Sequence, residues 1–201
     1  MTEIKSTQWH RRCAWSFAMM LILVAGPHAH AQLSEGQWLG EVFGGNYAPG
    51  PDDVLDDEST FGLRAFNMLT PRLALGGSVS MVNFEDTVTD GSLTVSFDTD
   101  VLLVDISAGY VLRADKRVAI ALGGGVGGSF SSTDATFSTP LVRGFFEDFD
   151  ESSFTVNVVA GPVFHLTKRI YLKPLVRMRW FENRDDDETD LESTLAVGFK
   201  F

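Results

Sequence analysis

Charged side chains recur at alternate positions of otherwise apolar segments, and their pairing is the first chemistry that the sequence suggests. Glu41 and Arg64 stand in two neighbouring segments, while Arg179 and Glu192 flank the last long acidic run. A register that sets Glu41 opposite Arg64, and Arg179 opposite Glu192, places each pair on one face of two antiparallel strands. Burying an unpaired charge costs several kcal/mol, so we expect these groups to neutralise one another and to define the register. The predicted network is Glu41, Arg64, Asp105, Lys173, Arg177, Arg179 and Glu192, with Lys200 as a further candidate.

Catalytic chemistry has little support in the sequence. Beyond residue 31 the only histidine is His165, which stands just before a short basic connection. A general base must reach the proton that it removes, and a serine or threonine without such a base is not an activated nucleophile. We expect His165 to be a polar group with a structural role. The sequence therefore predicts a protein that is not an enzyme, and it predicts no cofactor.

Acidic runs at Asp52–Glu58 and Glu182–Asp190 offer the oxygen ligands that Ca²⁺ and Mg²⁺ prefer. Neither run has the spacing of an EF-hand loop, and no glycine stands where that loop turns. We interpret both as solvated surface segments and predict no metal site, although a weak collective role for divalent cations near lipopolysaccharide phosphates stays open. The net charge of −11 excludes the basic surface that a nucleic-acid-binding protein needs.

The N-terminal residues have the parts of a secretory signal peptide. A basic start is followed by an apolar run from Cys13 to Gly26 and by the small-x-small sequence Ala29-His30-Ala31. The apolar run is shorter than the ~20 residues of a membrane-spanning helix. The sequence predicts a cleaved signal peptide at residues 1–31 and one exported domain at residues 32–201. The exported chain then lacks cysteine and has no disulfide.

Apolar residues alternate with small or polar ones along nearly all of the exported chain, which is the period of β-strands. No stretch keeps apolar residues at helical spacing over three turns. Strands are expected at Gln37–Tyr47, Thr60–Asn67, Leu73–Met81, Leu102–Leu112, Val118–Val126, Phe154–Phe164, Ile170–Trp180 and Leu195–Phe201.

The connections between these strands alternate in length and in charge. Short basic connections are expected at Leu69–Arg72, Arg113–Arg117 and Thr167–Arg169. Long connections, which hold most of the acidic residues, are expected at about Ala48–Ser59, Glu85–Asp100 (partly strand), Ser131–Ser152 and Glu182–Asp190. Such alternation is typical of an up-and-down meander with an even number of strands, whose termini both lie at the short-turn end.

Side-chain size indicates which face of the strands meets which surroundings. A soluble eight-stranded barrel also alternates, but its apolar face points inward. Here the polar series is mainly Gly, Ala, Ser and Thr, which suit a narrow interior, and the apolar series is bulky with aromatic residues near its ends. From Phe154 to Phe164 a strand tilted by about 40° rises roughly 25 Å, the height of the outer-membrane apolar band. The predicted aromatic girdles contain Trp38, Tyr110, Phe130, Phe154, Phe164, Trp180 and Phe199. The predicted fold is thus an all-β, eight-stranded antiparallel up-and-down transmembrane β-barrel.

The C-terminal segment Leu195-Ala-Val-Gly-Phe-Lys-Phe201 is an alternating apolar strand that ends in phenylalanine. Together with the glycine-rich opening Val42-Phe-Gly-Gly-Asn-Tyr47, it makes the exported chain resemble the small eight-stranded outer-membrane barrels of Gram-negative bacteria, the OmpA and OmpX types. Its closer resemblance is to the OmpX type, because no peptidoglycan-binding domain follows the last strand. Such an ending resembles the signal that the barrel assembly machinery recognises, formed here by Leu195, Val197, Phe199 and Phe201.

The resemblance implies a bacterial outer-membrane protein with extracellular loops and periplasmic termini, in contact with membrane lipids and lipopolysaccharide. It implies a structural role or an adhesion-type role, in which the acidic loops meet a host or surface ligand. One alternative is a narrow channel for small or lipophilic solutes like the OmpW-type barrels, which needs an apolar lumen. Another is a lipid A-modifying enzyme, whose histidine must reach the outer leaflet, whereas His165 stands near the basic turns.

Overall fold

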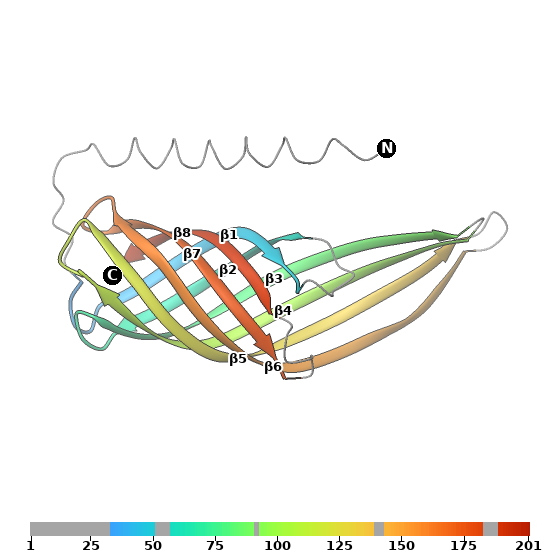
Figure 1. Cartoon of the computed structure of the whole chain (residues 1–201), viewed down its shortest axis with the longest axis horizontal. Helices are drawn as coiled ribbons and strands as arrows, with labels where there is room; N and C mark the ends of the chain where they lie inside the picture. Colours follow the sequence, from blue (N-terminus) through green and yellow to red (C-terminus); the bar gives the residue numbers. More distant parts are fainter. Residues whose placement is uncertain (1–32, 51–56, 91–92, 139–142, 183–188) are drawn as a thin grey trace.

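Eight antiparallel strands close into a barrel in the computed structural model, which describes residues 33–50, 57–90, 93–138, 143–182 and 189–201 (Figure 1). Strands adjacent in sequence pair throughout, and β8 pairs back with β1, so the predicted up-and-down barrel is confirmed. The predicted signal peptide lies outside the described residues. Across the described ranges, no helix has the length and apolar character that crossing a bilayer requires. The strands are β1 (Trp38–Ala48), β2 (Glu58–Met68), β3 (Leu73–Asp90), β4 (Leu93–Leu112), β5 (Val118–Ser138), β6 (Arg143–His165), β7 (Ile170–Phe181) and β8 (Asp190–Lys200).

The apolar series of each strand faces outward. In β8, buried and exposed residues alternate without interruption, with Glu192 turned inward and Leu195 and Val197 turned outward. Ile106, at the middle of the apolar stretch of β4, is 66% exposed. An eight-stranded barrel has room inside only for packed side chains, so the bulky apolar series is on the outer surface and forms a belt around the barrel.

Short, tight turns connect the strands at one end of the barrel, which we call the turn end; the C-terminus lies there as well (Figure 1). In two of these turns a threonine hydroxyl caps the backbone. Thr70 Oγ1 accepts from the backbone N–H groups of Arg72 and Leu73, at 3.2 and 3.0 Å, and Thr167 Oγ1 accepts from those of Arg169 and Ile170, at 3.1 and 2.9 Å. These side chains satisfy backbone donors that a tight turn would otherwise leave to water.

At the opposite end, which we call the loop end, β3, β4, β5 and β6 continue well past the other strands (Figure 1). β6 has 23 residues and β8 has 11, whereas a strand needs about 9–11 to cross a bilayer. The stretch Ser131–Ser152, predicted as a connection, is therefore mostly strand, and Glu85–Asp100 is almost entirely strand.

Cross-strand contacts explain why these acidic stretches pair. Thr87 and Ser96 hydroxyls lie 3.2 Å apart, and those of Thr99 and Thr133 lie 3.0 Å apart. Acidic residues are more frequent in loops than in strands, but this is only a statistical trend. β-Branched residues at alternate positions favour pairing between strands. Where both strand faces meet water, charged side chains do not oppose the backbone hydrogen bonds between strands.

Candidate functional site

A layer of ionised side chains crosses the middle of the barrel, and Asp105 on β4 is its centre. Arg179 binds Asp105 with both terminal nitrogens, Nη1 to Oδ1 at 2.8 Å and Nη2 to Oδ2 at 3.0 Å. Arg177 Nη1 donates to Oδ2 at 2.9 Å. Ser78 Oγ and Asn157 Nδ2 also donate to this carboxylate, at 3.2 and 3.0 Å. Both oxygens of a buried carboxylate are thus saturated by protein donors.

Glu192 on β8 links this centre to the opposite wall. Its Oε2 accepts from Arg177 Nη1 at 3.2 Å, and its Oε1 accepts from Arg64 Nη2 at 3.1 Å. Arg179 Nη2 lies 3.8 Å from the same carboxylate. Because each arginine contacts at least one carboxylate, the ionised layer holds strands from both sides of the barrel together.

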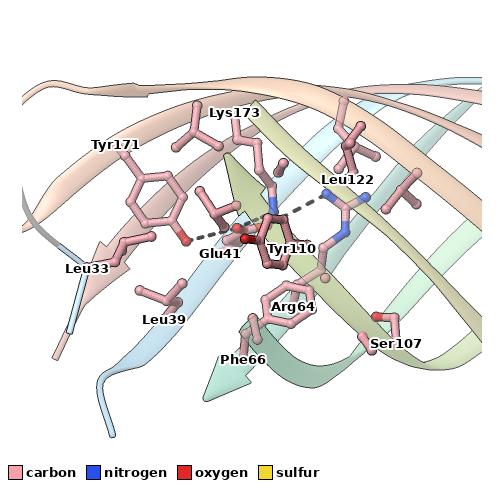
Figure 2. A pocket seen from close by; sticks show the side chains of 18 of the residues that line it. Leu33, Leu39, Glu41, Arg64, Phe66, Ser107, Tyr110, Leu122, Tyr171 and Lys173 are labelled. Atoms are coloured by element: carbon pink, nitrogen blue, oxygen red, sulfur yellow. Dashed lines mark hydrogen bonds and ion pairs between the residues drawn. The ribbon is translucent and has the colours of Figure 1, made fainter. Parts of the chain in front are cut away.

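Glu41 on β1 occupies the turn-end side of the layer, where Tyr171 and Lys173 both point toward it (Figure 2). Its Oε1 accepts from Lys173 Nζ at 2.5 Å and from the Tyr171 hydroxyl at 2.8 Å. The observed register sets Glu41 directly opposite Arg64, with 3.8 Å between Oε2 and Nη1. Gly198 makes room for the tyrosine, because a Cβ at this position would lie 2.1 Å from the Tyr171 ring.

The register of the last hairpin differs from the predicted one. Arg177 lies opposite Glu192, and Arg179 lies opposite Asp190, so the predicted pairing of Arg179 with Glu192 is off by one inward position. The predicted acidic connection ends at Asp190, yet Asp190 is the first residue of β8 and is buried. Its carboxylate accepts from the Tyr47 hydroxyl, which draws it into the lumen rather than into a surface loop.

The structure places every member of the predicted charge network inside the barrel, each of them buried. Arg64 also stacks on Phe43, with its guanidinium carbon 3.5 Å from the ring centroid. The buried network consists of Glu41, Arg64, Asp105, Lys173, Arg177, Arg179 and Glu192, and Lys200 is buried nearer the turn end. A buried ion is costly unless it is paired, and each of the seven network members has a partner of opposite charge. The ammonium group of Lys200 forms no ion pair or hydrogen bond with the described residues.

Two apolar layers inside the barrel, one on each side of the ionised layer, were not predicted from the sequence. Leu103 and Val111 belong to them, and both stand in continuous apolar runs of β4 where a period of two does not identify the inward residue. The continuous apolar runs are the feature of the sequence that could have indicated buried residues on both faces of β4. The turn-end layer contains Leu33, Leu39, Met68, Ala74, Val111, Ala114, Ala119, Val163 and Tyr171. The loop-end layer contains Tyr47, Val82, Phe84 and Leu103.

A cavity of about 70 Å³ lies between the turn-end apolar layer and the ionised layer, lined by Leu33, Leu39, Glu41, Phe66 and Tyr171 among others (Figure 2). This volume can hold a few water molecules. Small-molecule sites usually occupy about 300–1,000 Å³. This cavity is therefore too small to bind an organic solute.

Leu33 precedes β1 and closes the turn end of the lumen. It is buried, and the backbone beside it is held by hydrogen bonds from Gly36 N to Met68 O, at 2.7 Å, and from Met68 N to Gln37 O, at 2.9 Å. Leu33→Ala is expected to lower the free energy of unfolding by about 2 kcal/mol, the low end for a buried leucine, because a terminal segment can partly refill the space. Urea unfolding in detergent micelles measures this loss. Leu69→Ala, at a largely exposed leucine of a turn, is the control.

The predicted girdle and C-terminal residues all belong to the outward-facing series. Phe130 and Phe154 lie toward the loop end, and Trp38 and Phe199 lie toward the turn end; all four are exposed. Tyr110 is exposed, and Phe164 and Trp180 are partly exposed. In the C-terminal series Leu195, Val197, Phe199 and Phe201 are exposed. Phe201 N donates to Trp38 O at 2.9 Å, which continues the closure of the barrel beyond β8.

The other candidate groups are not brought together into a site. His165 is buried at the turn end, with its ring centroid 6.0 Å from that of Tyr171, and neither ring nitrogen has a hydrogen-bond partner among the described residues. Most of the acidic runs Asp52–Glu58 and Glu182–Asp190 falls outside the described residues. Elsewhere in the described chain, no three His, Cys, Asp or Glu residues lie close enough to hold a metal ion.

Comparison with known proteins agrees with this geometry. The model of the outer membrane protein β-barrel domain family matches residues 16–201. Similar solved structures include the N-terminal β-barrel domain of OprF from Pseudomonas aeruginosa, which is 16% identical with a TM-score of 0.53 and covers 83% of this chain and 98% of its own. Neisserial surface protein A (NspA) is 15% identical, with a TM-score of 0.54 and the same coverage of 83% and 98%.

A third similar structure is Ail, the attachment invasion locus protein of Yersinia pestis, in complex with the heparin analogue sucrose octasulfate. It is 16% identical, with a TM-score of 0.50, and covers 83% of this chain and 99% of its own. Among curated proteins, none matches the chain at a significant level. Likeness at this level of identity establishes the fold, while the match to the family model establishes membership. The chain therefore belongs to the outer membrane protein β-barrel domain family, and it is a transmembrane β-barrel of the bacterial outer membrane.

Proposed function

We propose that this protein is a non-enzymatic surface protein whose sealed barrel anchors an extracellular β-sheet that binds a basic protein partner. In this proposal the loop end faces outward from the cell, and the turn end and both termini face the periplasm. Short periplasmic turns and longer extracellular connections are usual in outer-membrane barrels, which supports this orientation. The alternative contribution, to envelope integrity alone, needs no partner.

The observation that carries the proposal is a pair of sheet edges at the loop end beside which no further strand lies among the described residues. Pairing between β2 and β3 ends at Thr60 opposite Val82, whereas β3 continues to Asp90. Pairing between β6 and β7 ends at Thr155 opposite Phe181, whereas β6 begins at Arg143. The described residues place no further strand beside either stretch. An exposed edge presents backbone donors and acceptors to which an extended segment of another protein can add as a strand.

Charge indicates the kind of partner. Glu85, Asp98, Asp100 and Glu151 are exposed on the extended strands, and the chain as a whole has a net charge of −11. A basic segment is attracted to this surface, and polyanions are repelled. The sucrose octasulfate in the Ail complex is a polyanion, so the acidic sheet favours a different class of ligand for this protein.

The rival functions have weaker support. A channel for small or lipophilic solutes needs a continuous path, but one ionised and two apolar layers cross the lumen between Leu33 and Phe84. A lipid A-modifying enzyme needs a general base at the outer leaflet. In the proposed orientation His165 lies at the periplasmic end, which is too far from that leaflet.

A short peptide of alternating lysine and valine tests strand addition. With the protein in lipid nanodiscs, the peptide is expected to bind and to slow hydrogen exchange at the backbone amides of Asn83–Asp90 or of Arg143–Phe154. The matched peptide of alternating glutamate and valine is not expected to bind. Shortening both extensions, by joining Glu85 to Asp98 and Thr133 to Glu151 through tight turns, should weaken binding of the lysine peptide at least ~10-fold, or about 1.4 kcal/mol.

Heat-modifiable gel mobility serves as the folding control for the shortened variant, and protease treatment of intact cells checks the orientation. Equal binding of both peptides, or undiminished binding by the folded shortened variant, would contradict the proposal. Reproducible single-channel steps in planar bilayers that Arg179→Ala or Glu192→Ala alters would favour the channel. Altered lipid A in cells that express the protein would favour the enzyme.

A further inference from the structure

A second, larger cavity lies inside the loop end of the barrel, above the apolar layer. Its volume is about 270 Å³, and we call it the vestibule. Tyr47 and Phe84 line its floor, where their rings meet edge to face with centroids 6.1 Å apart. The Tyr47 hydroxyl donates to Asp190, which anchors the floor to β8. The vestibule is thus a pocket with a closed base rather than a passage through the barrel.

The walls combine aromatic, hydroxyl and carboxylate groups. Phe181 lines the vestibule from β7, and Thr99, Ser129 and Thr133 line it from β4 and β5. Glu151 lies opposite Ser131 in the β5–β6 pair, at the inward register position, and it lines the vestibule from β6. These walls suit a ligand with an apolar or aromatic part that packs on the rings and a polar group that binds a carboxylate.

Charge decides the sign of that group. Among the described side chains beyond the ionised layer, none is a lysine or an arginine, whereas the acidic residues that line the vestibule are Glu151 and Asp190. Asp190 accepts from the Tyr47 hydroxyl, and no basic side chain of the described residues forms an ion pair with Glu151. A recess lined by one sign of charge concentrates ions of the opposite sign.

We propose that the vestibule binds a small organic ammonium ion, an amine carried on a hydrocarbon or aromatic group. Its cation lies near Glu151, and its hydrocarbon or aromatic group packs on the floor that Tyr47 and Phe84 form. The hydroxyls of Thr99 and Ser129 accept its remaining N–H donors. A bare divalent cation suits the vestibule less well, because such ions require several free carboxylate oxygens. This inference does not depend on strand addition at the sheet edges.

Three isosteric probes test the proposal: benzylammonium, benzyl alcohol and benzoate. With the protein in nanodiscs, benzylammonium is expected to shift the methyl NMR signals of Thr99, Val101 and Thr133, and to bind at least ~10-fold more tightly than benzyl alcohol. Benzoate is expected to cause no shift. The methyl signals of Val79 on the outer face report partitioning into lipid and should not move. Equal affinity for the amine and the alcohol, or shifts at Val79 alone, would overturn the proposal.

Two variants that remove the same charge separate a local effect from a general one. Glu151→Gln is expected to weaken benzylammonium binding about tenfold, equivalent to 1.4 kcal/mol. Asp100→Asn removes a charge from the outer face of β4 and should change the affinity less than ~2-fold, because water screens it from the vestibule. Phe84→Leu tests the rings independently and should weaken binding several-fold. Equal losses of affinity in Glu151→Gln and Asp100→Asn would show that the overall negative charge, and not a site in the vestibule, attracts the amine.

Discussion

Asp105→Ala is expected to lower the free energy of unfolding by about 3–5 kcal/mol, the largest effect that we predict for a single substitution. The carboxylate accepts from Arg177 and from both terminal nitrogens of Arg179, at 2.8 to 3.0 Å. Both arginines are buried, so removing the carboxylate leaves guanidinium charges without their closest counterion. Most of the lost stability comes from the arginines that stay buried without a counterion, and less from the removed attraction itself.

Urea-induced unfolding in detergent or lipid vesicles, followed by gel mobility, measures this effect. Asp115→Ala is the matched control, because that carboxylate is exposed in a turn and pairs only locally with Lys116, so the urea midpoint should not move. The double variant Asp105→Ala with Arg179→Met removes one stranded cation together with its partner. It should recover part of the stability that Asp105→Ala loses. If the double variant is less stable than the single one, stranded charge is not the cause.

Ile106→Arg is expected to destabilise the barrel folded in a bilayer by about 2–4 kcal/mol, since the residue lies at the middle of the apolar belt. Ile106 faces outward on β4 and is 66% exposed. On the surface of a soluble protein the same substitution would change stability by no more than about 0.5 kcal/mol. The size of the effect therefore reports that hydrocarbon surrounds the belt.

Reversible folding into lipid vesicles, monitored by tryptophan fluorescence, gives the measurement for Ile106→Arg. Ile106→Leu keeps the apolar character and should change little. Asp100→Arg places an arginine on the same face of the same strand but beyond the belt, where the cost falls to about 0–1 kcal/mol. Equal costs at positions 100 and 106 would contradict the placement of the belt.

The layered lumen connects the fold to the proposed function. Ion pairs among Asp105, Arg177 and Glu192 bridge strands on different sides of the barrel, and apolar layers exclude water above and below them. A lumen filled in this way makes a rigid base. The extended strands β3 to β6 leave that base together, which lets their outer edges and the vestibule keep a defined geometry.

Local pattern in the sequence was sufficient for the fold class. A strict alternation such as that of β8 assigns each residue to one of two faces, and the size of the side chains tells which face can enter an eight-stranded barrel. The same alternation placed Glu41, Arg64 and Asp105 on the inward face, where the structure has them. Each of these inferences needs only neighbouring residues along one strand.

Tertiary structure alone decided which residues meet. Glu192 lies opposite Arg177 and not opposite Arg179, because β8 begins at Asp190. Asp190 is in turn bound by Tyr47, which is distant in sequence. The convergence of Arg177 and Arg179 on Asp105 across the lumen likewise follows from closure of the barrel. The length of β5 and β6 and the apolar layers around Leu103 could not be predicted from the sequence for the same reason. A period of two specifies the face of a residue, whereas register, strand length and cross-lumen contacts are set by all eight strands together.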